Sequence, residues 1–142
     1  QYDGTNWGPT YPGSGIRNML INGDMTINQR NTTRTTSGFT VDRWYFDNQS
    51  TASLSAAANT DVPTGQGFIN SLRVTTVTGA ASHGYVSLSQ RIEGLNSAQL
   101  AFGTANAKTV TVSFWVRSSV TGTYSVDLIN SETATQHKQA LH

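Results

Sequence analysis

The side chains in this sequence that are best suited to holding a ligand are aromatic. Trp44, Tyr45, Tyr85 and Trp115 have flat apolar faces on which a pyranose ring can stack, if polar groups lie close by to orient it. Aromatic residues on alternating strands belong to a core more often than to a ligand site, and this is the competing interpretation for each residue. Trp115 fits it least well, because period-two alternation places it opposite the apolar side chains of its own segment.

A metal ion is a second candidate ligand. The run Asn22-Gly23-Asp24 offers amide and carboxylate oxygens, which are the ligands that Ca²⁺ prefers. A plain turn held by an Asn or Asp side chain explains the same residues. The sequence favours the turn and leaves structural calcium at Asn22 and Asp24 as the alternative.

Two short groups of charged residues stand out in a sequence with few charges. Asp42 is followed by Arg43, and Arg91 lies close to Glu93. An arginine–carboxylate pair between the two segments would fix their register through directional hydrogen bonds. We expect this pairing to be structural, with ligand contact as the minority interpretation.

No residue pattern predicts catalysis. The histidines lack a spacing typical of metal ligands, and the chain has no cysteine for disulfides or thiolate metal sites. Neither a Ser-His-Asp set nor a glycosidase pair stands out among the carboxylates. The chain is therefore expected not to be an enzyme. The carboxylates considered were Asp24, Asp42, Asp47, Glu93 and Asp127.

Short β-strands must position these residues. Residues 109–117 alternate strictly between apolar and polar side chains, residues 118–122 are typical of a turn, and residues 124–128 resume the alternation. This pattern predicts a hairpin. Further strands separated by turn residues predict an all-β antiparallel sandwich or barrel, with a short helix or strand at 97–102. The other expected strands are 40–47, 51–58, 71–77 and 85–92.

The ends of the chain differ from its middle. Residues 1–16 are rich in Gly, Pro and small polar residues, which predicts a connector from an upstream region. Residues 17–142 are expected to form one β-sandwich domain. Because the alternating pattern stops after residue 130, we expect later strands to complete the sheets beyond this sequence.

Composition excludes two classes of partner. The net charge is +1 and only 12% of the 142 residues are charged, so no basic surface for nucleic acid is expected. No apolar run approaches the roughly 20 residues needed to cross a membrane. Thr, Ser, Asn and Gly replace the missing charges, which suits strands and turns.

Several motifs together resemble a known family. Residues 18–25, 27–30 and 40–44 resemble the opening of a domain found in bacteriophage tail-fibre and other virion proteins, frequent in marine and cyanobacterial phages. Residues 89–94 and 103–116 are similar to its later signatures, in the same order. Residues 1–7 look like the short element that ends many phage fibre repeats.

This resemblance implies a galactose-binding-domain-like jelly roll, related to non-catalytic carbohydrate-binding modules and incomplete here at its C-terminus. It also implies a structural virion protein, most often a homotrimer, whose jelly roll contributes to adhesion to a host-surface glycan. Structural calcium near the opening motif is common in related modules. The alternatives are a capsid decoration or head-fibre protein, and the carbohydrate-binding module of a secreted hydrolase.

Overall fold

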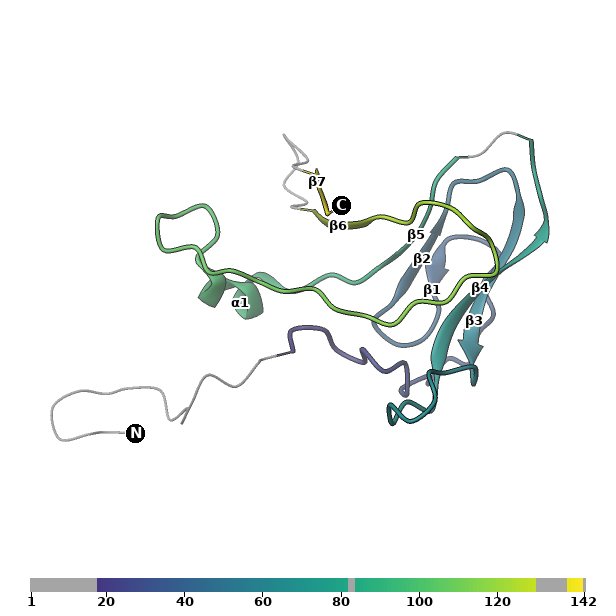
Figure 1. Cartoon of the computed structure of the whole chain (residues 1–142), viewed down its shortest axis with the longest axis horizontal. Helices are drawn as coiled ribbons and strands as arrows, with labels where there is room; N and C mark the ends of the chain where they lie inside the picture. Colours follow the sequence, from purple (N-terminus) through teal and green to yellow (C-terminus); the bar gives the residue numbers. More distant parts are fainter. Residues whose placement is uncertain (1–17, 82–83, 130–137, 142) are drawn as a thin grey trace, which may run out of the picture. The chain divides into compact units, whose positions relative to one another are not determined.

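The computed structural model describes residues 18–81, 84–129 and 138–141, and most of its regular elements are antiparallel β-strands (Figure 1). The expected connector at 1–16 lies outside the described residues. The chain divides into two compact units, Gln1–Val110 and Thr111–His142. The elements are β1 Gly38–Phe39, β2 Tyr45–Asn48, β3 Ser53–Asn59, β4 Ser71–Thr78, β5 Val86–Ser89, α1 Gly94–Ser97 with a 3₁₀ turn Ala98–Leu100, β6 Val126–Ile129 and β7 Lys138–Leu141.

The first sheet has three antiparallel strands in the order β1-β2-β5. Phe46 lies opposite Gly38 on one side and Leu88 on the other. The expected strand at 40–47 begins only at Tyr45, because residues 41–44 form a turn. In that turn the Trp44 amide donates to the Val41 carbonyl oxygen at 3.1 Å.

The second sheet is the antiparallel pair β3–β4. Its side chains meet those of the first sheet at Phe46, which is fully buried and packs with Leu54 and Ala56 of β3. Arg34 also exchanges two backbone hydrogen bonds with Ala56, at 2.8 and 2.7 Å. These contacts form a small core, in which Phe46 supplies the largest fully buried side chain.

A network of hydrogen bonds around Asn22 joins three segments that are distant in the sequence. The Asn22 amide donates to the carbonyl oxygens of Ile27 and Asp42, at 2.9 and 2.8 Å, and accepts from the Ile27 amide at 2.8 Å. The Trp44 indole donates to the Asn22 carbonyl oxygen at 2.9 Å. The side chain of Gln90, just after β5, both donates to and accepts from the Ile21 backbone, at 2.8 Å each. We call this set of contacts the Asn22 network.

The predicted helix or strand at 97–102 is helical, since α1 continues into the 3₁₀ turn. Ala101 then ends it in a left-handed conformation, with φ 50°. Within the described part of the chain, no helix is long and apolar enough to cross a membrane.

The predicted hairpin at 109–128 is wrong. Residues 109–117 belong to no strand in the structure, and β6 pairs instead with β7. An alternating segment becomes a strand only where another strand takes up its backbone hydrogen bonds. Within the described ranges no strand pairs with 109–117, and large apolar side chains there, Phe114, Trp115 and Val116, are exposed.

Candidate functional site

One face of the three-stranded sheet is partly exposed to solvent and carries aromatic and polar side chains. Successive side chains of a strand point to opposite faces, so Tyr45 and Asp47 lie opposite to the buried Phe46. The pairs Phe39–Tyr45 and Asp47–Ser87 show that β1 and β5 contribute to the same face. We call this surface the outer face; its residues are Ser37, Phe39, Tyr45, Asp47, Gln49, Tyr85, Ser87 and Ser89.

Asp47 forms the polar centre of the outer face. Its Oδ1 accepts from the Ser37 hydroxyl at 2.9 Å and from the Gln49 amide at 2.8 Å, and its Oδ2 accepts from the Tyr85 hydroxyl at 2.9 Å. These bonds, that from Gln49 foremost, lower the pKa of the Asp47 carboxyl. The group is therefore a fixed negative charge at neutral pH with an unused acceptor position on Oδ2.

Tyr85 is the most exposed aromatic residue of this face, with 60% of its surface accessible. Its hydroxyl bond to Asp47 holds the ring in one place and raises the pKa of the Tyr85 phenol. Its carbonyl oxygen accepts from the Gln49 amide at 3.0 Å, which extends the pairing of β2 with β5 by one step. The ring is thus anchored at both its backbone and its hydroxyl, yet open to a ligand.

Gly84 allows this close approach. A Cβ atom at position 84 would lie 1.8 Å from the Gln49 carbonyl oxygen, a distance that no side chain can tolerate. Only glycine lets the chain pass Gln49 closely enough to place Tyr85 beside Asp47. Gly84 is therefore a positioning residue for the outer face.

A second aromatic group lies further along the same face. The rings of Phe39 and Tyr45 meet edge to face, with centroids 5.2 Å apart. The Arg30 guanidinium lies over the Phe39 ring at 5.4 Å. Tyr45 and Tyr85 are four positions apart in the strand register, a separation of about 13 Å along the strands at the usual rise per residue.

The predicted aromatic ligand residues are therefore only partly brought together. Tyr45 and Tyr85 share the outer face. Trp44 does not join them, because its indole is bonded to the Asn22 carbonyl oxygen within the Asn22 network. Trp115 belongs to the other compact unit and is 64% exposed.

The two residues proposed for calcium have different surroundings. The Asn22 side chain is only 9% exposed and is committed to backbone groups of the Asn22 network. Asp24 is exposed, and its Oδ1 accepts from the Thr26 amide at 3.4 Å, the kind of side-chain turn that the sequence favoured. The residues that the structure describes contain no cluster of three or more His, Cys, Asp or Glu able to hold a metal. Calcium at Asn22 and Asp24 stays a prediction.

The expected arginine–carboxylate pair is confirmed as Arg43–Glu93. It joins the turn at 41–44 to the residue before α1, and it lowers the pKa of Glu93. Arg43 adopts the left-handed region with φ 75°. Both side chains are partly exposed, so the pair orients its segments and adds little stability.

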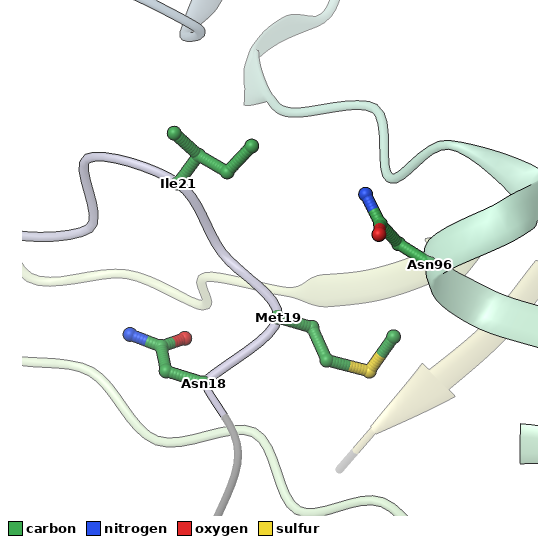
Figure 2. A pocket seen from close by; sticks show the side chains of 4 residues that line it. All are labelled: Asn18, Met19, Ile21 and Asn96. Atoms are coloured by element: carbon green, nitrogen blue, oxygen red, sulfur yellow. The ribbon is translucent and has the colours of Figure 1, made fainter. Parts of the chain in front are cut away.

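The structure also has an open hollow of about 230 Å³, lined by Asn18, Met19, Ile21 and Asn96 (Figure 2). Figure 2 shows Asn96 on α1, across from the three residues near the start of the described chain. The lining contains no charged side chain, and its polar groups are the amides of Asn18 and Asn96.

Of the outer face, the sequence predicted only Tyr45 and Tyr85 as ligand residues. It did not predict the place of Phe39 and Asp47 beside them, or the positioning role of Gly84. Period-two alternation through 45, 47 and 49 was a usable signal for Asp47. Phe39 and Gly84 gave no such signal, because strand pairing alone places them.

Comparison with known proteins adds no relative to this picture. No family model, curated protein or solved structure matches the chain.

Proposed function

We propose that this chain is part of a non-enzymatic structural protein of a bacteriophage tail fibre, and that its β-rich domain binds a host-surface glycan through the outer face. The supporting observation is the grouping of Tyr45, Tyr85 and Asp47 on one sheet face, where Tyr85 is exposed and the other two are half-buried. In this proposal the strands belong to a jelly-roll sandwich, as the motif resemblance implies.

The geometry indicates the class of glycan. Stacking positions at Tyr45 and Tyr85 are about 13 Å apart, longer than one pyranose ring, so an oligosaccharide of more than one sugar fits better than a monosaccharide. Asp47, halfway along, accepts hydrogen bonds from sugar hydroxyls and repels carboxylated or sulfated sugars. A neutral oligosaccharide is therefore the expected ligand.

A set of variants tests this site by titration calorimetry against neutral and anionic oligosaccharides. Tyr85→Ala removes the stacking ring and should abolish measurable binding. Tyr85→Phe keeps the ring but loses the hydroxyl bond to Asp47, so affinity should fall about tenfold. The matched control is Tyr124→Ala, a similarly exposed tyrosine of the other unit, which should bind as the parent does.

The same assay separates the two candidate stacking surfaces. If Trp115→Ala abolishes binding while Tyr85→Ala does not, the glycan site lies in the second unit and the outer face is not the ligand platform. If neither variant nor the parent chain binds any glycan, adhesion is not its function.

Particle location is tested by electron microscopy with an antibody raised to this chain. Label at the tail periphery supports a fibre adhesin. Label over the head would show a capsid decoration or head-fibre protein, and unlabelled particles would leave the module of a secreted hydrolase as the better assignment.

Self-association is part of the proposal. The second unit exposes apolar side chains in its described residues, at Phe114, Trp115, Val116 and Val120. Other copies of the chain in a homotrimer would cover such side chains, and weak glycan sites gain strength when several act together.

A further inference from the structure

Asn22 is followed by Gly23, and this is the only Asn-Gly pair in the sequence. Asparagine deamidates most readily when glycine follows it, because glycine has no side chain to hinder attack of its backbone nitrogen on the asparagine side chain. The Gly23 nitrogen loses its proton and bonds to Cγ of Asn22, the Cγ–Nδ2 bond breaks, and ammonia leaves. Water then opens the cyclic imide to aspartate or isoaspartate.

The Asn22 network opposes this reaction in the folded chain. Attack requires the Asn22 side chain to turn toward the Gly23 nitrogen, but its amide holds three hydrogen bonds to the backbone of Ile27 and Asp42. The side chain is also nearly excluded from water, at 9% exposure. Deamidation therefore requires local opening of the network.

Aspartate, a product of deamidation, does not fit the site that the Asn22 side chain occupies. An aspartate at position 22 has no amide hydrogens for the carbonyl oxygens of Ile27 and Asp42, which lie 2.9 and 2.8 Å from Nδ2. A charged oxygen there would face two acceptors and repel both. Once the reaction has occurred, the opened network cannot close in its original form.

We propose that Asn22-Gly23 is a latent deamidation site that the fold protects, and that its modification converts a reversible local opening into a permanent one. The extent of deamidation at Asn22 therefore reflects how often the network has opened. The site is independent of glycan binding and of the particle in which the chain resides.

Peptide mass spectrometry tests the protection. The chain is incubated at mildly alkaline pH, folded or in urea, and the aspartate plus isoaspartate content at position 22 is followed with time. We expect the reaction to be at least about tenfold slower in the folded chain. Equal rates in the two conditions would overturn the proposal.

Two variants complete the test. Gly23→Ala should slow the reaction in urea and still fold, because an added Cβ meets only ordinary contacts, at 3.7 Å from Asn18 and 3.9 Å from Leu20. Asn22→Asp mimics the product and should unfold at lower urea than the parent, or fail to fold. A variant as stable as the parent would show that the site accommodates the product, which contradicts permanent opening.

Discussion

At the scale of single residues, the side chains of the Asn22 network hold the fold together, and the outer face is the surface that we propose binds a ligand. Asn22, Trp44 and Gln90 are each bonded to backbone of another segment. The aromatic and acidic residues of the outer face are bonded mainly to one another. Changes in the two groups should therefore have different effects, on stability in one case and on binding in the other.

Replacing Trp44 tests the structural role of its indole. Trp44→Phe removes the donor to the Asn22 carbonyl oxygen, and we expect the free energy of unfolding to fall by about 1 kcal/mol. Urea denaturation measures this loss. The control Trp115→Phe changes an exposed ring and should stay within about 0.5 kcal/mol of the parent. Equal effects for the two variants would contradict the role given to Trp44.

Asp47 and Tyr85 should set the pH range in which the outer face is ordered. Because the pKa of Asp47 is lowered, the stability that the ionised carboxylate contributes is complete above the ordinary pKa of an aspartate. This stability is lost as the pH falls through the lowered value. Because the pKa of Tyr85 is raised, the stability that the protonated phenol contributes is complete below the ordinary pKa of a tyrosine. This stability is lost as the pH rises through the raised value.

Thermal melts across pH check both limits. In a plot of melting temperature against pH, Asp47→Asn should reduce the fall at acid pH relative to the parent. Tyr85→Phe should reduce the fall at alkaline pH. The lowered pKa of Glu93 contributes to the fall at acid pH in both variants, so only the difference from the parent is informative. An unchanged plot in both variants would show that the Asp47–Tyr85 bond is not formed in solution.

At the scale of elements, the outer face depends on how closely the end of β2 passes the start of β5. That approach is set by backbone at Gly84 and Gln49. The side chains of the face are correctly placed only if this pairing is kept.

A matched pair of glycine variants tests this dependence. Gly84→Ala places a Cβ 1.8 Å from the Gln49 carbonyl oxygen, so the strands must separate and Tyr85 must leave Asp47. We expect loss of glycan binding and lower stability. Gly79→Ala, where an added Cβ meets nothing within 4 Å, should change neither. Calorimetry and urea denaturation report the two effects, and full binding by Gly84→Ala would show that the approach is unimportant.

At the scale of the whole molecule, the exposed apolar side chains of the second unit predict self-association. Phe114 and Val116 are 59% and 68% exposed. Changing both to serine should shift the chain from trimer to monomer with little effect on its unfolding, because neither is buried in the single chain. Sedimentation velocity measures this shift; Ser113→Ala is the control, and a parent chain that is monomeric would contradict the prediction.

Part of this structure could be predicted from the sequence. Alternation and turn residues located β3, β4 and β5 and the all-β class. β3 pairs with β4, the next strand in the chain, and β5 pairs with the more distant β2. The strand at 40–47 was predicted too long, since the tight turn ending at Trp44 follows from bonds to Thr40 and Val41 that no local pattern reveals. The segment 109–117 has the alternating pattern of a strand but pairs with no strand among the described residues. The outer face could not be predicted because it depends on strand register, which sequence alone does not provide.

The bond between Gln90 and Ile21 has a consequence for the order of folding. The two residues are 69 positions apart, so the Ile21 backbone can make these bonds only after Gln90, just beyond β5, has been synthesised. Contacts of such long separation form slowly, because a long loop must close first. During synthesis on the ribosome, the apolar residues 19–21 therefore lack this contact until β5 and Gln90 have been made. Chaperone contact or premature association during synthesis is therefore expected to act first at Met19 to Ile21.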